Sequence, residues 1–308
     1  LMKKLTFLLV FALFCAVNTL FAKTNYYEDN LFDSLEEGDK VALLMVHFGT
    51  SYSDTRSKTI DVLNNLAKER YAELEHRQAW TSRIIIRKMS GLGEQIDNPA
   101  EALQKLANEG FTHVIVQSSN IIEGVEMESL RRDVLSVRSL FKDIRVGQPL
   151  LYSKNDYEVV VKALRQKQPK GVSLLLVGHG TYTPSTAQYA MTQYVIDELG
   201  YDAMHVATIE GYPDFNSATL RLMNDRRKKD VLLMPFMFVS GQHSAKDIEG
   251  DWRVRLSKLG YNVTTRLEGL GELKEVQELF MEHIDFAIEN QMYDIVEKKS
   301  NYAGKTKK

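Results

Sequence analysis

The sequence predicts an α/β fold with two similar lobes, each a parallel sheet flanked by helices, and a cleft between them. Short apolar runs alternate with segments of helical periodicity, which is the pattern of βαβ units. The runs end in glycine-bearing polar turns, such as the one at Gly49 and the one at residues 178–180. Three strands of the first half can also be laid, in the same order, on three strands of the second half. Together these observations favour a duplicated α/β architecture.

The first lobe is assigned to residues 40–153. Its best-supported helix spans residues 99–109, because Pro99 stands at its start and Gly110 lies just past its end. The expected strands are short, most of them are apolar, and a helix follows most of them. The expected strands are 41–46, 75–81, 112–117 and 144–151, and the expected helices are 54–71, 99–109 and 128–141.

The second lobe is assigned to residues 154–297, beginning with a linking helix at 156–168. Its strands are expected at 171–177, 205–210 and from Val231 onward. The strand at Val114 can be laid without gaps on the strand at Val231, which places Glu126 on His243. In the same way residues 76–81 are laid on residues 205–210. The two halves are therefore expected to be an internal repeat of one α/β lobe.

The two ends of the chain have compositions of their own. Residues 1–22 combine an early lysine pair, an apolar stretch and a final Ala22, as in a secretory signal. We expect cleavage near Ala22 and a periplasmic or otherwise exported protein. Residues 23–39 are expected to be a lead-in segment and residues 298–308 a solvated basic tail.

Composition excludes several classes of function. Cys15, the only cysteine, lies inside the expected signal, so the mature chain has no thiolate nucleophile, disulfide or cysteine-ligated metal. The formal net charge of −2 gives no reason to expect a nucleic-acid partner. A lysine-bearing phosphate loop, GxGxxG spacing and a GxSxG elbow are all absent from the sequence. We therefore expect neither a nucleotide cofactor nor a hydrolase serine.

Three candidate metal ligands follow strands of the second lobe: His179, Glu210 and His243. Ligands bind outside the carboxyl ends of parallel strands, so these side chains are expected at one edge, with Glu126 facing them from the first lobe. Two imidazoles and a carboxylate suit Co²⁺, Fe²⁺, Ni²⁺ or Zn²⁺ and leave coordination positions open. The alternative for His179 is a turn histidine that caps the next helix.

The sequence supports a role in the site less strongly for several other residues. Gly49, Thr50 and Ser51 precede a helix and can offer backbone amides to an anionic group. His47 lies at the end of the first strand, where a mouth-lining role and a structural role are equally compatible with the sequence. His113 and His205 lie at strand starts and are expected to be surface residues.

The sequence resembles the class II tetrapyrrole chelatases, most closely the anaerobic cobaltochelatases that insert cobalt into sirohydrochlorin. The likeness extends from Ala42 to about Ile288 and depends on several motifs in order and at similar spacing. They are residues 48–52 (FGTSY), 85–88 (IIRK), 102–107 (ALQKLA), 155–157 (NDY), 178–180 (GHG), 210–213 (EGYP), the loop around Met234-Pro235 and His243, and 269–272 (GLGE).

This resemblance implies a ferrochelatase-like fold and ATP-independent insertion of Co²⁺, or of Fe²⁺ or Ni²⁺, into a tetrapyrrole. The metal ligands would be His179, Glu210 and His243. His179, Glu126 and His243 would take part in catalysis, with neutral histidine or carboxylate accepting the pyrrole protons. Gly49, Thr50, Ser51 and Arg87 would bind substrate, although Arg87 also fits a solvated helix face. Two departures from the family pattern are Asn120, where a histidine is usual, and a shorter loop after His243.

A secretion signal is unexpected for this family, because corrin and sirohaem synthesis is cytoplasmic. A second interpretation is therefore a periplasmic haem- or metal-binding protein, or one that removes iron from haem, using the same cleft. A third, a solute-binding protein, explains two lobes and secretion but not the two histidines and the glutamate. A homo-oligomer is left open.

Overall fold

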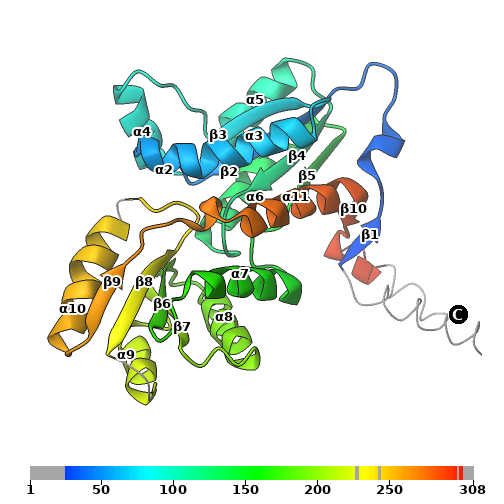
Figure 1. Cartoon of the computed structure of the whole chain (residues 1–308). Coiled ribbons are helices and arrows are strands. Elements are labelled where there is room, and N and C mark those ends of the chain that lie inside the picture. Colours follow the sequence, from blue (N-terminus) through cyan, green and yellow to red (C-terminus); the bar gives the residue numbers. More distant parts are fainter. Residues whose placement is uncertain (1–24, 226–228, 242–243, 297, 301–308) are drawn as a thin grey trace, which may run out of the picture. The chain divides into compact units, whose positions relative to one another are not determined.

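The computed structural model describes residues 25–225, 229–241, 244–296 and 298–300 (Figure 1). The chain divides into a large unit, residues 39–284, and a small unit made of residues 1–38 and 285–308. In the described ranges, every helix is too short or too polar to cross a membrane. The predicted signal, residues 1–22, lies outside these ranges.

The first lobe of the large unit contains a four-stranded parallel sheet in the order β3-β2-β4-β5. Its strands are β2 (Val41–His47), β3 (Glu75–Trp80), β4 (His113–Ser118) and β5 (Asp143–Val146). Its helices are α2 (Ser53–Lys58), α3 (Ile60–Arg70), α4 (Arg83–Gly91), α5 (Pro99–Asn108), α6 (Val125–Val137) and the 3₁₀ turn η2 (Arg138–Leu140).

The second lobe has a sheet with the corresponding order, β7-β6-β8-β9, again all parallel. Its strands are β6 (Ser173–Gly180), β7 (Met204–Glu210), β8 (Asp230–Phe236) and β9 (Asn262–Thr265). The helices are α7 (Lys154–Lys167), η3 (Pro184–Thr186), α8 (Ala187–Glu198), α9 (Phe215–Asn224), the π-helix η4 (Ser244–Trp252), α10 (Arg253–Lys258) and η5 (Leu270–Glu272). The chain then continues into α11 (Lys274–Glu289), which bonds to Arg70 and Tyr71 of the first lobe.

The predicted repeat is present, and its register can be compared strand by strand. Ala42 lies opposite Val114 and Ser173 lies opposite Val231, so the gapless overlay of β4 on β8 agrees with the ladders. The overlay of the second strands is wrong by one residue. Leu43 pairs with His76, whereas its counterpart Leu174 pairs with Met204 rather than with His205. A shared histidine suggested the wrong register, and a shift of one residue moves each side chain to the other face.

Some predicted elements have different bounds for reasons visible in the backbone. The helix expected at 54–71 is interrupted at Thr59, whose buried hydroxyl donates to the Thr55 carbonyl at 2.6 Å and whose φ and ψ are −126° and −78°. The strand expected at 144–151 ends at Val146. Beyond it, the amides of Leu150 and Leu151 donate to the loop after β4, at residues 120 and 121, instead of to a strand. The helix expected at 128–141 begins earlier, at Val125.

The central strand of each sheet is buried on both faces, and one of these faces packs under helices that follow the strands. In the first lobe, alternate β2 residues pack with side chains of α5 and α6. In the second lobe, Leu175 and Val177 of β6 pack with Leu222 of α9 and with Ile248 and Trp252 of η4. Because side chains alternate along a strand, the next odd-numbered residue, 179, extends the face formed by Leu175 and Val177.

The small unit contains a feature that the sequence did not predict. Strand β1 (Tyr26–Glu28) pairs antiparallel with β10 (Asn290–Met292), and the 3₁₀ turn η1 (Leu31–Ser34) follows β1. The Tyr26 ring meets the Phe286 ring edge-on, with centroids 5.0 Å apart. Residues 25–38 therefore form elements of their own, and the chain from Asp285 onward groups with them. The predicted bounds of the lobes stay predictions.

The connection between the lobes is anchored by Asp156. Its carboxylate accepts the amides of Tyr152 and Ser153 at 3.2 and 2.6 Å and completes a capping box at the start of α7. The same carboxylate lies 3.5 Å from Nε2 of His283 on α11, and both side chains are buried. Burial alone would raise the pKa of Asp156, but the hydrogen bonds from His283 and Ser153 outweigh it and lower the pKa. The NDY motif at 155–157 therefore has a structural role.

We predict that Asp156→Asn lowers the free energy of unfolding by about 2 kcal/mol at pH 7, because it removes a buried charged acceptor. A carboxyl whose pKa is lowered by folding stabilises the native state above its unfolded pKa of about 3.9 and loses this contribution as the pH falls through the folded value. The difference between the two proteins should therefore shrink below about pH 4. Urea unfolding across pH 3–7 measures it, with the exposed Asp202→Asn as control. Equal effects of the two substitutions would contradict the assignment.

Candidate active site

His179 is the penultimate residue of β6, the central strand of the second sheet, and its side chain is half-buried at the carboxyl edge. Its Nδ1 lies 3.4 Å from the carbonyl oxygen of Gly180, a long hydrogen bond. The predicted location at a strand end is confirmed.

The glycines on either side of His179 are required by their surroundings. A Cβ added at Gly178 would lie 2.4 Å from Cε1 of Tyr189, whose ring packs against that residue. A Cβ at Gly180 would lie 1.6 Å from the carbonyl oxygen of Glu210, and Gly180 has a φ of +87°. Neither contact tolerates a side chain, and the second also needs a backbone conformation that glycine adopts most easily. The GHG sequence therefore follows from close packing on both sides of the histidine.

Glu210 is the last residue of β7 and lies in register with Gly180. Its side chain is exposed. The backbone of the loop after it is held by hydrogen bonds from two threonines. The hydroxyl of Thr186 accepts the Tyr212 amide at 3.1 Å and donates to the Tyr212 carbonyl at 2.7 Å. Thr208 donates both its amide and its hydroxyl to the Pro213 carbonyl. The structure thus brings Glu210 to the same sheet edge as His179 on a well-anchored loop.

Glu126 is half-buried in the first turn of α6. The loop that leads into this helix is tied to the second lobe. The amide of Glu123 donates to Gln188 Oε1 at 2.8 Å, and the hydroxyl of Ser185 donates to the Glu123 carbonyl. Glu126 therefore lies three residues after Glu123, whose backbone is bonded to α8 and η3. These two elements follow β6 in the second lobe.

The loop after β8 also meets the first lobe. The hydroxyl of Thr55 donates to the Ser240 carbonyl at 3.0 Å, and Thr50 Oγ1 lies 3.8 Å from the position of a Cβ on Gly241. His243 itself lies outside the described residues. Within the described part of the chain, no three or more His, Cys, Asp and Glu side chains are grouped closely enough to hold a metal ion. The predicted three-ligand set therefore stays a prediction.

The predicted substrate-binding residues of the first lobe have different surroundings. Gly49 and Thr50 are buried, and a Cβ on Gly49 would lie 2.5 Å from the Trp80 ring. Ser51 is half-buried, and Thr50 Oγ1 accepts the Tyr52 amide at 3.2 Å. Arg87 is exposed on α4. Gly49 and Thr50 thus have a packing role, and contact of these four residues with substrate stays a prediction.

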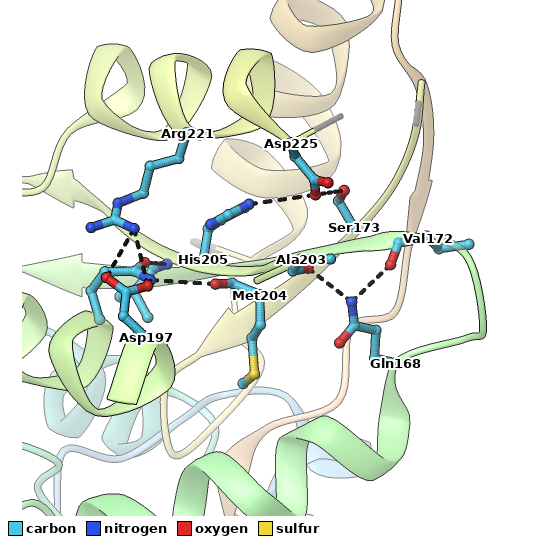
Figure 2. Close-up of polar contacts among 11 residues, drawn as sticks. Gln168, Val172, Ser173, Asp197, Ala203, Met204, His205, Arg221 and Asp225 are labelled. Carbon is cyan, nitrogen blue, oxygen red and sulfur yellow. Dashed lines mark hydrogen bonds and ion pairs between the residues drawn. The ribbon is translucent and has the colours of Figure 1, made fainter. Parts of the chain in front are cut away.

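The histidines at the opposite edge are buried, contrary to the expectation that they lie on the surface. His205 Nε2 is 3.8 Å from Asp225 Oδ2, which also accepts the Ser173 hydroxyl at 2.6 Å (Figure 2). The pKa of His205 is lowered, chiefly by burial. His113 has Nδ1 2.9 Å from Thr112 Oγ1. The ring nitrogens of His205 thus lie near a carboxylate without a hydrogen bond to it, whereas His113 contacts a hydroxyl, and strand pattern alone does not reveal such neighbours.

The sequence did not predict that Tyr189 contacts the glycines on both sides of His179. It lies on α8, is 3% exposed, and its hydroxyl accepts the Gly180 amide at 3.3 Å. In the sequence Tyr189 is one more aromatic residue of an expected helix, and no local pattern pairs it with residues 178–180.

Comparison with known proteins places this geometry in a family. Residues 41–289 match the model of the cobalt chelatase (CbiK) family. The sirohydrochlorin cobaltochelatase of Salmonella typhimurium is 36% identical over 257 residues, which cover 81% of this chain and 97% of the relative. The chain belongs to the CbiK family.

A second relative is the sirohydrochlorin cobaltochelatase CbiKC of Nitratidesulfovibrio vulgaris. It is 29% identical over 81% of this chain and 91% of its own length.

Among solved structures, SirB from Bacillus subtilis with Fe³⁺ has a TM-score of 0.59 at 14% identity, covering 81% of this chain and 96% of that chain. The cobalt complex of the SirB chelatase from B. subtilis subspecies spizizenii has a TM-score of 0.55 at 12% identity, with 81% and 95% coverage. These likenesses show the fold, and they confirm the predicted α/β chelatase architecture. The family match begins and ends close to the bounds of the large unit, so β1 and β10 lie outside it.

His47 of this family member is structural. It is fully buried, with Nδ1 2.9 Å from Ser119 Oγ and Nε2 2.8 Å from Asn64 Oδ1. Burial lowers the pKa of His47 to about 4, although the Asn64 hydrogen bond opposes this and the charge of Arg56 adds to it. The ring is therefore neutral near pH 7.

We predict that His47→Gln reduces the pH dependence of stability between about pH 6.5 and 4. In this window the unfolded state binds the proton more readily than the native state, so the wild type loses stability as the pH falls. The loss is of the order of 2–3 kcal/mol. Urea unfolding at several pH values measures the slope, with the half-buried His76→Gln as control. A variant with the wild-type slope would contradict the buried, neutral assignment.

Proposed function

We propose that this protein inserts Co²⁺ into sirohydrochlorin without a nucleotide cofactor. One observation carries the proposal: in a chain of the CbiK family, His179 stands at a glycine-bounded strand end, and Glu210 occupies the neighbouring strand end in register with Gly180. Its matched relatives in Salmonella typhimurium and Nitratidesulfovibrio vulgaris are both named sirohydrochlorin cobaltochelatases. An imidazole beside a carboxylate is a suitable donor pair for a borderline divalent cation.

His179, Glu210 and His243 hold the substrate metal in this proposal. The long contact between Nδ1 of His179 and the Gly180 carbonyl favours the tautomer with the proton on Nδ1. Nε2 then carries the lone pair that a metal requires. With three protein ligands, Co²⁺ keeps positions at which pyrrole nitrogens replace water.

Metal insertion also requires removal of the two inner N–H protons of the macrocycle. In our proposal Glu126 accepts them together with the histidines. Its half-buried place in the first turn of α6, three residues after a segment bonded to the second lobe, supports this role. The anchored loop before α6 holds this turn against the second lobe.

The macrocycle carries carboxylates that need cationic or amide partners. We assign this role to Arg87, which is exposed on α4, and to the segment Gly49-Thr50-Ser51. Lys88 on the same helix places Nζ 5.7 Å from the centre of the exposed Tyr52 ring, so cationic and aromatic groups lie together there. Arginine pairs with carboxylates through two parallel hydrogen bonds.

The metal preference and the haem alternative follow from the same donor set. Fe²⁺ and Ni²⁺ accept imidazole and carboxylate ligands as Co²⁺ does, so we propose them as secondary substrates. Insertion rates with each metal at equal concentration test the order. Tight haem binding without any insertion into sirohydrochlorin would favour the haem-binding alternative instead.

We further propose that the protein is exported, supported by the basic, apolar and small-residue pattern of residues 1–22. Cell fractionation and N-terminal sequencing test this. A mature chain that begins near Lys23 in the periplasmic fraction is the expected result, and an uncleaved chain in the cytoplasm would contradict it.

We predict that His179→Ala lowers kcat/KM for Co²⁺ about 100-fold or more, because loss of even an outer partner of a metal ligand typically costs 10- to 100-fold. Anaerobic absorbance change of sirohydrochlorin on Co²⁺ addition measures the rate. His76→Ala, which alters a histidine at the start of β3, serves as the control. An unchanged rate for His179→Ala would remove this residue from the site.

We predict that Glu126→Gln lowers kcat about 100-fold or more, the contribution expected of a proton acceptor, with little change in Co²⁺ binding. Glu128→Gln is the matched control, because Glu128 lies in the same helical turn and is exposed. If both variants keep the wild-type kcat, Glu126 is not the proton acceptor.

A further inference from the structure

Tyr189 connects the core of the second lobe to the backbone beside His179. Its ring lies against Gly178 and meets Phe236 of β8 at a centroid distance of 6.2 Å, edge to face. Its hydroxyl accepts the amide of Gly180 at 3.3 Å. One side chain thus contacts the residues before and after the proposed ligand.

Gly180 contacts three residues of the proposed site. Its amide meets the Tyr189 hydroxyl, its carbonyl oxygen lies 3.4 Å from His179 Nδ1, and its α-carbon approaches the Glu210 carbonyl so closely that no side chain fits. A rotation of this residue would therefore change the orientation of His179 and its spacing from Glu210 together.

We propose that Tyr189 is a positioning residue for metal insertion, which fixes the orientation of the His179 imidazole and the separation of His179 from Glu210 by holding the Gly180 backbone. This inference rests on the proposed function and deepens it. Tyr189 does not touch the metal or the macrocycle in this role. It acts through Gly178 and Gly180.

The chemistry of the hydroxyl fits a permanent hydrogen-bonding role. Burial raises the pKa of Tyr189 to about 12, against a smaller opposing effect of the Gly180 hydrogen bond. The hydroxyl therefore stays neutral near pH 7, and its oxygen accepts the Gly180 amide. An outer partner of this kind typically changes metal affinity or activity 10- to 100-fold.

The test is Tyr189→Phe, which removes the hydroxyl and keeps the ring against Gly178. Co²⁺ binding is first measured without tetrapyrrole, by the visible absorption of the bound ion. Insertion is then measured with sirohydrochlorin. We expect the Kd for Co²⁺ to rise about 10-fold and kcat/KM for Co²⁺ to fall by a similar factor, with KM for sirohydrochlorin within about twofold of wild type.

Two controls separate positioning from general stability. Tyr194→Phe changes an exposed tyrosine of the same helix and should leave all values unchanged. Phe236→Leu loosens the packing around the Tyr189 ring but keeps the hydroxyl. It should lower the melting temperature more than Tyr189→Phe does and leave the Kd of the folded protein for Co²⁺ near wild type.

Wild-type Co²⁺ affinity in Tyr189→Phe would overturn the proposal, as would an equal loss of affinity in Phe236→Leu, because the effect would then be one of packing. Failure of the proposed function gives a different result. In that case the wild type shows no insertion at all, while the Co²⁺ titrations of the two variants still decide the role of Tyr189.

Discussion

The structure of the site depends on the close approach of two parallel strand ends. Gly180 passes so near the Glu210 carbonyl that only a glycine fits, and its φ of +87° turns the chain out of the sheet at that point. His179 lies one residue before this turn. Glu210 lies at the end of β7, the neighbouring strand whose carbonyl leaves no room for a side chain on Gly180. The anchoring of Tyr212 on Thr186 and the packing of Tyr189 on Gly178 fix the two sides of this contact.

The duplicated lobes share their frame but differ in chemistry. Both sheets have the same strand order, and Gly49 and Gly180 occupy matching strand ends with positive φ. In that register the counterpart of His179 is Phe48, and the counterpart of Glu210 is Ser82, the N-cap of α4. We infer that the second lobe carries the metal-binding role, while the first offers Glu126, an exposed aromatic ring and cationic side chains for the macrocycle.

The succession of strands and helices, the repeat, and the places of His179 and Glu210 at strand ends could be predicted from the sequence, because they depend on apolar runs and on glycines at strand ends. The register of β7 could not, since His76 and His205 suggested an overlay that backbone pairing rejects. The β1–β10 pair joins two three-residue strands from distant parts of the chain, which no local pattern marks. The burial of His47 depends on Asn64 and Ser119, partners that only the folded chain brings together.

The central claim is that the strand end at Gly180 presents His179 to the substrate metal. X-ray absorption of Co²⁺ bound to the protein without tetrapyrrole tests it most directly, because imidazole rings give characteristic multiple scattering. We expect scattering from histidine and oxygen ligands in the wild type, and fewer imidazoles bound to Co²⁺ in His179→Ala. An unchanged histidine contribution in that variant would contradict the account, because the metal would then be held elsewhere.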